Sequence, residues 1–385
     1  MNQKLLIWIF LGSIALFTSC VEKNVNVTGN LVKDVNSPTT LTADKEWTVE
    51  GYVNIISDLI IEPGTVIKFK EDASLNIGNG KYGSLKAIGT ADKPIIFTSA
   101  SSNPEAGDWD GVYFYDQNSS TQSELSYCKF MYGGQTSAYD DEGGLVELYD
   151  TDLKITNCTF SHINNCGIYL NTNSEFVAFE HNRIEDCGKH LMVLPATAAG
   201  TIGADNIFTT NKNYGILVTQ SEIKTNVEWK TQTVPFFVHD WISVNGNNAV
   251  FIIHAGTVVK FNPYGAIVNG NDSNGKFLAD GLPDSPVIFT SAASVASKGD
   301  WQFIQFGEFT SAGSGLNYAV VEYGAGAYDD DEDAVINIYS DKVSISHCTI
   351  RENEGYGIYI WYDLSPDVND NIFSNNNNAD IYKVE

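Results

Sequence analysis

The stretch LIIEPGTVIKF at 59–69 decides the fold, because it recurs as FIIHAGTVVKF at 251–261. PIIFTSA at 94–100 recurs as PVIFTSA at 286–292, and GDW at 107–109 recurs at 299–301, each with an offset of 192 residues. A fixed offset over several separate segments is typical of an internal duplication. The pattern predicts two tandem copies of one unit, at 43–222 and 223–385.

Each copy is built from short runs of β-branched and aromatic residues separated by Gly, Asn, Asp and Ser, which predicts an all-β chain. Asn157, Asn182 and Asn206 precede similar runs at spacings of 25 and 24 residues, and Asn371 does so in the second copy. This spacing favours the coil of a parallel β-helix, with asparagines at corners that need a left-handed backbone. A sandwich or a propeller also has short strands, but a propeller blade needs about 40 residues.

The segments LIIEPGTVIKF, GSLKAIGTADKPIIFTS and GDWDGVYF, at 59–69, 83–99 and 107–114, resemble a known group. They are similar to right-handed parallel β-helix proteins of the pectin-lyase-like superfamily, especially lipoproteins of Bacteroidetes. The resemblance covers 43–385 in two passes. It implies a single-stranded right-handed solenoid and specifies the scaffold without specifying an activity.

The N-terminus has the pattern of an export signal. Lys4 precedes an apolar run at 5–17, and small residues lead directly to Cys20. The run is shorter than the about 20 apolar residues of a membrane span, so 1–19 is predicted to be a signal peptide. LFTSC resembles the lipobox of bacterial lipoproteins, which implies a lipid on Cys20, a tether at 20–42 and an outer-membrane location, on a face left open. A soluble secreted protein is the alternative.

Charge narrows the choice of partners. The chain carries a net charge of −26, and its two arginines are Arg183 and Arg351. Nucleic acid is therefore excluded as a favoured partner. Polyanionic glycans are disfavoured as well, because guanidinium is the usual group that grips carboxylates and sulfates. A neutral polysaccharide or an envelope protein remains.

Strand alternation predicts which side chains leave the coil. In VYFY at 112–115, VELY at 146–149 and IYL at 168–170, the aliphatic residues and Phe114 would point inward. Outward aromatics on a flat sheet can stack on sugar rings, or they can simply stack between coils. The candidate ligand-binding residues are Tyr113, Tyr115, Glu147, Tyr149, Tyr169, Tyr339, Tyr359 and Trp361, with Asn337 matching Glu147.

Two acidic loops recur at matching places and are candidate Ca²⁺ sites. Their carboxylates would repel one another unless solvated or bound to a cation, and Ca²⁺ accepts six to eight oxygens. A solvated turn is the alternative. The candidate metal ligands are Asp140, Asp141 and Glu142 in the first loop and Asp329, Asp330 and Asp331 in the second.

The sequence contains no motif typical of catalysis on this fold, neither a Gly-His-Gly nor an Arg-x-Lys cluster. A carboxylate pair could form only within one copy, for example Glu147 with Asp116 or Asp150, because glycosidase carboxylates work within about 10 Å. The six histidines are interpreted as turn or surface residues, and Trp109 and Trp301 of the GDW motifs as packed corners. The leading hypothesis is a non-catalytic glycan-binding lipoprotein; a polysaccharide hydrolase or lyase and an adhesive spacer are the alternatives.

Five cysteines follow Cys20. Cys166 and Cys187 share a position before a glycine and could form a disulfide between neighbouring coils, since export permits oxidation. Reduced apolar packing is the alternative for all five. Cys128 and Cys158 are expected to be buried ladder residues.

Overall fold

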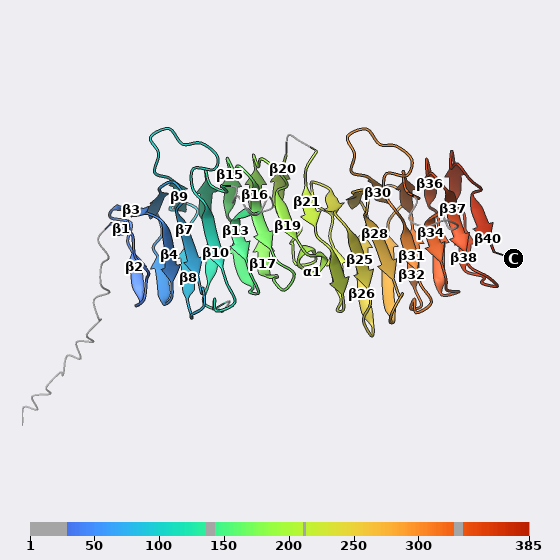
Figure 1. The fold of residues 1–385 in the computed structure, drawn as a ribbon, viewed down its shortest axis with the longest axis horizontal. Helices are drawn as coiled ribbons and strands as arrows, with labels where there is room; N and C mark the ends of the chain where they lie inside the picture. Colours follow the sequence, from blue (N-terminus) through green and yellow to red (C-terminus); the bar gives the residue numbers. More distant parts are fainter. Residues whose placement is uncertain (1–28, 120, 136–142, 211–212, 327–333, 385) are drawn as a thin grey trace, which may run out of the picture.

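The computed structural model describes residues 29–119, 121–135, 143–210, 213–326 and 334–384. Over these residues the chain is one elongated solenoid, and its neighbouring strands pair in parallel (Figure 1). This confirms the prediction of an all-β parallel β-helix. Acidic loop residues Asp140, Asp141, Glu142 and Asp329 to Asp331 lie outside the described residues, as does Cys20.

Three sheets form the first part of the solenoid. The 8-stranded sheet contains β1 (Asn30–Leu31), β3 (Glu46–Val49), β6 (Val66–Phe69), β9 (Ile95–Ser99), β12 (Cys128–Met131), β15 (Thr159–Ser161), β18 (Arg183–Glu185) and β20 (Ile207–Thr209). The first 6-stranded sheet contains β2 (Thr39–Leu41), β5 (Asp58–Ile61), β8 (Ser84–Ile88), β11 (Glu124–Ser126), β14 (Leu153–Thr156) and β17 (Phe176–Glu180).

The third sheet has 13 strands and runs through both parts of the chain. It contains β4 (Tyr52–Ile55), β7 (Ser74–Ile77), β10 (Gly111–Phe114), β13 (Gly144–Leu148), β16 (Cys166–Leu170), β19 (Met192–Leu194), β21 (Ile216–Val218), β24 (Phe236–Val238), β27 (Val258–Phe261), β30 (Val287–Ser291), β33 (Ala319–Glu322), β36 (Thr349–Arg351) and β39 (Ile372–Ser374).

Two further sheets complete the second part. A 7-stranded sheet contains β22 (Ser221–Ile223), β25 (Trp241–Val244), β28 (Ala266–Asn269), β31 (Ile304–Phe306), β34 (Ala334–Ile338), β37 (Tyr356–Ile360) and β40 (Ile381–Lys383). The second 6-stranded sheet contains β23 (Val227–Trp229), β26 (Ala249–His254), β29 (Gly275–Asp280), β32 (Ser314–Asn317), β35 (Val343–Ser346) and β38 (Asp367–Asn369).

Segments of matching sequence do not occupy matching sheets. β6 at 66–69 lies in the 8-stranded sheet, whereas its sequence counterpart β27 at 258–261 lies in the 13-stranded sheet. Likewise β7 lies in the 13-stranded sheet and its counterpart β28 in the 7-stranded sheet. A strand of the second part therefore lies one sheet further around the coil than the strand of matching sequence in the first part.

The change of role occurs around a short helix, α1 (Ala196–Ala199), which follows β19 where earlier coils have a strand of the first 6-stranded sheet. Alanine favours the helix and lets it pack closely, and three of its residues are buried. The Ala196 N–H donates to Ser221 Oγ at 2.8 Å, and Trp229 Nε1 donates to the Ala196 carbonyl at 3.0 Å. The helix is thereby joined to the first strands of both later sheets. The predicted copy boundary at 222/223 falls within β22.

The first coil begins earlier than the predicted tether allows. Leu31, Val35 and Leu41 are at most 4% exposed and belong to the main core. β1 pairs with β3 and β2 pairs with β5 in register. Residues from Asn30 onward are thus part of the solenoid, because their alternating apolar side chains fill its interior.

Asparagines hold the corners, but in a register that differs from the prediction by one residue. Asn157 does have a left-handed backbone, with φ of 56°; in the next coil His181 takes that position, and Asn182 follows it. Asn182 Oδ1 accepts the Cys158 N–H at 2.9 Å, and its Nδ2 donates to the Ile155 carbonyl at 2.9 Å. Its buried side chain therefore satisfies the backbone of the preceding coil.

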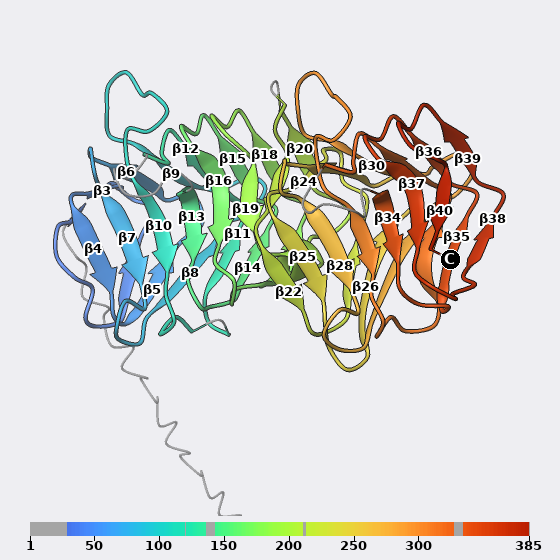
Figure 2. The same ribbon diagram turned by 45° about the vertical axis from the view of Figure 1, so that its right-hand side comes forward.

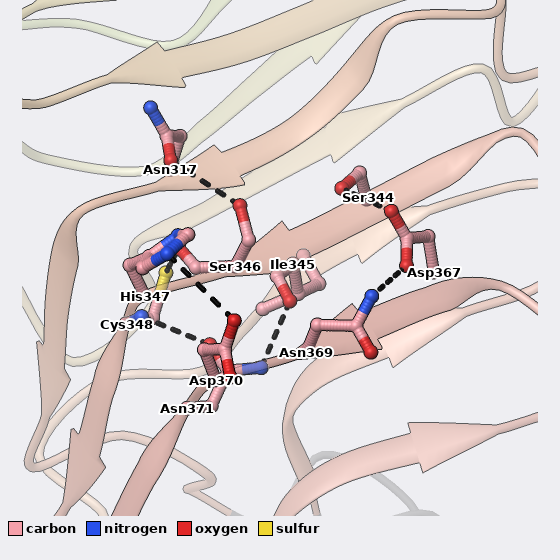
Figure 3. A network of polar contacts seen from close by, with 10 residues as sticks. All are labelled: Asn317, Ser344, Ile345, Ser346, His347, Cys348, Asp367, Asn369, Asp370 and Asn371. Atoms are coloured by element: carbon pink, nitrogen blue, oxygen red, sulfur yellow. Dashed lines mark hydrogen bonds and ion pairs between the residues drawn. The ribbon is translucent and has the colours of Figure 1, made fainter.

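Figure 3 shows the same arrangement in the second part. Asn371 Oδ1 accepts the Cys348 N–H at 2.9 Å, and its Nδ2 donates to the Ile345 carbonyl at 2.8 Å. His347 has a φ of 55° and lies 3.8 Å from Asp370. The interpretation of His347 as a turn residue is confirmed, since histidine and aspartate tolerate the left-handed region more readily than most residues.

The GDW motifs are packed corners, as predicted. Trp109 and Trp301 are fully buried. Trp109 stacks on Phe69 at 4.0 Å and donates to the Met131 carbonyl at 2.9 Å. Trp301 repeats this, stacking on Phe261 at 4.3 Å with a 2.8 Å bond to the carbonyl of residue 322. The loops before the two tryptophans project from the same edge of the solenoid (Figure 1 and Figure 2).

Candidate functional site

The predicted strand phase is correct for the inward residues, since Val112, Phe114, Val146 and Leu148 are fully buried. The alternate residues form a ladder on the other side of the 13-stranded sheet. Tyr113 pairs with Glu147 in register, and Glu147 pairs with Tyr169. The structure thus brings the first-copy candidates together.

This first-copy group is largely occupied by its own contacts. Glu147 is only 7% exposed. Its Oε1 accepts the Gly144 N–H at 2.7 Å, and its Oε2 accepts the Tyr149 hydroxyl at 2.5 Å. Burial, together with the Glu147 charge, raises the pKa of both Tyr113 and Tyr149, so these phenols remain protonated donors. Glu147 therefore organises the tyrosines.

Two of the first-copy rings stack on one another, whereas Tyr149 and Tyr169 are tilted by 45° at 5.8 Å. Tyr115 and Tyr149 lie 5.4 Å apart with only 15° between their planes, and the Tyr115 hydroxyl lies 3.5 Å from Asn76 Oδ1. Rings stacked in this way cover each other's faces, which are the parts that a sugar would need. This geometry favours the alternative of stacking between coils for Tyr115 and Tyr149.

Asp150 and Asp116, the two predicted carboxylate partners of Glu147, have hydrogen-bond partners of their own. Asp150 accepts Nδ2 hydrogen bonds from Asn171 at 3.0 Å and Asn173 at 2.8 Å, and these lower its pKa. Asp116 is exposed and accepts a hydrogen bond from Gln117. Both belong to turns at the end of the strand.

A different carboxyl group near the tyrosines was not singled out from the sequence. Burial, reinforced by the charge of Asp72, raises the pKa of Asp110 to about 6. The same carboxyl raises the pKa of Tyr52. Its place in the GDWD motif could have identified it, because the second copy has the uncharged Gln302 there.

The aromatic ladder of the first copy ends in a covered apolar cluster. Beyond Tyr169, the ladder continues through Val193, Leu217 and Phe237, which are at most 7% exposed. His190 packs edge-on against Phe237 at 4.9 Å. Burial lowers the pKa of His190 to about 4, and the Gly215 N–H donates to its Nδ1.

The second-copy candidates lie in a different sheet and have a different geometry. Gln305, Asn337 and Tyr359 pair in register across β31, β34 and β37, and Tyr359 pairs with Tyr382 of β40. These four side chains are uncharged. Asn337 is 4% exposed, and its Oδ1 has no hydrogen-bond partner among the described residues.

Several second-copy rings are tilted against one another, although Tyr382 also stacks on Tyr356 at 4.8 Å with 21° between the planes. Tyr339 lies 5.6 Å from Trp361 with 40° between the planes, and Tyr359 lies 5.9 Å from Tyr382 with 33°. Trp361 is 42% exposed and Tyr382 41%, whereas Tyr359 is buried beneath them. We call Tyr339, Tyr359, Trp361 and Tyr382 the aromatic surface. Tyr382 was missed because its strand, IYK at 381–383, lies at the end of the repeat.

The structure gives no disulfide among the cysteines of the described residues. Cys128, Cys158, Cys166, Cys187 and Cys348 are all buried. Cys166 belongs to the outer apolar cluster, whereas Cys187 belongs to the main core, so the two members of the proposed pair lie in different clusters. Cys128 and Cys158 are neighbouring core residues, as expected.

No group of three or more His, Cys, Asp or Glu side chains that could hold a metal occurs among the described residues. The Ca²⁺ prediction concerns loops outside them. No helix within the described ranges is long and apolar enough to cross a membrane.

Comparison with known proteins agrees with the fold. Residues 87–229 match the family model described as right handed beta helix region. No curated protein matches the chain, and no solved structure does. The match supports the parallel β-helix superfamily of pectin-lyase-like proteins, a fold found in carbohydrate-related and adhesive proteins.

Proposed function

We propose that this protein is an exported lipoprotein that binds a neutral glycan on the aromatic surface of its second part. The observation that supports this most directly is the 42% exposure of Trp361, whose ring is tilted by 40° against that of Tyr339. A tilted, exposed ring offers its face to the C–H groups of a sugar, and nearby uncharged amides suit hydroxyl groups.

The first copy supports the same choice by contrast. Its tyrosines surround a buried carboxylate at Glu147, and Tyr115 and Tyr149 cover one another. In the second copy Asn337 replaces that carboxylate, and Trp361 is 42% exposed. A neutral ligand therefore has better access and no charge to desolvate in the second copy.

The binding proposal is tested by affinity electrophoresis in gels that contain xylan, galactomannan or mixed-linkage β-glucan. Trp361→Ala and Tyr382→Ala should each abolish the retardation seen with the binding polysaccharide. The matched control is Tyr264→Ala, which removes a tyrosine that is 69% exposed elsewhere. Unchanged retardation of Trp361→Ala would overturn the site, and no retardation in any gel would overturn the neutral-glycan assignment.

The anchor is tested separately. Lipid on Cys20 predicts incorporation of a labelled fatty acid into the full-length chain in a bacterial host, and its loss in Cys20→Ser. Membrane fractionation should show the same difference. Equal labelling of both proteins would contradict the assignment without affecting the glycan site.

A further inference from the structure

A groove of about 480 Å³ lies in the first part, between the loop before Trp109 and the corners of two coils. Tyr132 and His162 line it with their rings 5.0 Å apart, and Glu105 and Asp186 stand at its sides. A neighbouring groove of about 270 Å³ shares His162 and Asp186 and adds Glu185. This groove belongs to neither the aromatic surface nor the tyrosine ladder.

The second part has the same corner and the same loop. The Glu105 N–H donates to Asp108 at 3.0 Å, and the Ser297 N–H donates to Asp300 at 2.8 Å. The matching corner residues, Asp186 and Asn375, both have a left-handed backbone, with φ of 53° and 58°. The two places can therefore be compared residue by residue.

In the second part a lysine of the protein itself occupies this place. Lys298 reaches from the loop and donates from Nζ to the Asn375 carbonyl at 2.5 Å and to Asn377 Oδ1 at 2.7 Å. The residue that matches Lys298 in the first loop is Ala106, directly before the shared GDW. Ala106 lines the first groove and cannot fill it.

The charges differ in the same sense. Glu105, Glu185 and Asp186 of the first part stand where the second part has Ser297, Ser374 and Asn375, whereas Glu352 and Glu354 of the second part stand where the first has His162 and Asn164. Among the described residues that line the two first-part grooves, none is Lys or Arg, and His162 Nε2 lies 3.8 Å from Asp186 Oδ2. The first groove thus combines more negative charge with the loss of the ammonium group that its counterpart contains.

We propose that the first groove binds the protonated amino group of an amino sugar in a glycan. Asp186 and Glu105 would receive the ammonium group in the place that Lys298 Nζ takes in the second part. The rings of Tyr132 and His162 form an aromatic wall for the sugar ring, and Ser161 and Thr209 add hydroxyl groups. The site goes beyond the neutral-glycan function and does not depend on it.

The test is isothermal titration calorimetry, which measures the affinity of the full chain at neutral pH for a glucosamine tetrasaccharide and for its fully N-acetylated counterpart. We expect at least about tenfold tighter binding of the free amine, weakening with salt as an ion pair requires. Ala106→Lys and Asp186→Asn should each lose at least about tenfold. Both introduce what the second part already contains, and thermal melting would verify the fold.

Two control variants separate a site from general attraction to an acidic protein. Ser102→Lys adds the same charge to the same loop outside the groove, and Asp370→Asn removes the carboxylate of another His–Asp pair, with His347, at a different corner. Neither should alter binding. Equal affinity for the acetylated sugar, or full binding by Ala106→Lys, would overturn the proposal. Binding of a lysine-rich peptide without binding of the amino sugar would also overturn it, in favour of a protein partner.

Discussion

The two parts of this solenoid share a backbone and differ in what they display. Trp109 and Trp301 make equivalent ring stacks and equivalent hydrogen bonds. In the loop before each tryptophan, a backbone N–H donates to the aspartate of the GDW motif. On the outside of the coil, the pair Tyr113 and Glu147 of the first part corresponds to the pair Gln305 and Asn337 of the second. Side chains that fill the interior are constrained by packing density, whereas outward side chains can change without cost to the coil.

The largest expected effect concerns the shared interior. Trp109→Ala and Trp301→Ala should each lower the free energy of unfolding by about 3–5 kcal/mol, since each removes a buried ring and leaves a carbonyl unpaired. Contacts in a solenoid are mostly between neighbouring coils, so each loss should stay within its own part. Hydrogen exchange with mass spectrometry measures this. Equal loss of protection in both parts would show that they unfold as one unit.

Next is His190, which exists only in the first part. Its pKa is lowered to about 4 in the folded protein. As the pH falls from 6.5 toward 4, His190 becomes protonated in the unfolded chain but stays neutral in the folded protein. The free energy of unfolding therefore falls by about 2 kcal/mol. His190→Phe should remove that part of the pH dependence in urea melts. His254→Phe is the control, and an unchanged profile in His190→Phe would contradict the prediction.

Asp110 should titrate in the opposite direction. Its pKa is raised to about 6, so its contribution to stability is complete below 3.8 and is lost as the pH rises through 6. The group is partly solvated, so we expect about 1 kcal/mol. Asp110→Gln, which copies Gln302, should be more stable than wild type at pH 7 and equal to it near pH 3.5. The prediction is wrong if urea melts show the same difference at both values.

The smallest expected effect concerns Lys298. Lys298→Ala removes two exposed hydrogen bonds, so it should cost less than about 1 kcal/mol in thermal unfolding. It would also open the second corner and make it resemble the first. A loss of several kcal/mol would mean that Lys298 supports the fold rather than filling a groove.

Much of the architecture could be predicted because the apolar side chains that fill the interior alternate along each strand and recur once per coil. The corner asparagines were placed one residue away, since a left-handed position accepts His181 as readily as Asn157 and the spacing alone cannot separate them. The tether was drawn too long for a related reason. Leu31, Val35 and Leu41 look like scattered apolar residues until their coil is closed.

The candidate site could be predicted only in part. The sequence identified Tyr339, Tyr359 and Trp361. What sets Trp361 apart from the stacked pair Tyr115 and Tyr149 is its exposure, which depends on how the neighbouring coils pack. Asp110 and Lys298 carried no motif of their own. Their importance comes from burial in one case and from reach across a corner in the other.

By itself, the sequence determined the class of fold, the inward side chains and the buried tryptophan corners, because these depend on local alternation and on a repeat of fixed length. Only the tertiary structure decided that strand roles move to the next sheet beyond α1, and which rings cover one another. It also decided that one corner is filled by a lysine while the other stays open. These features depend on contacts between coils, which a single chain pattern does not specify.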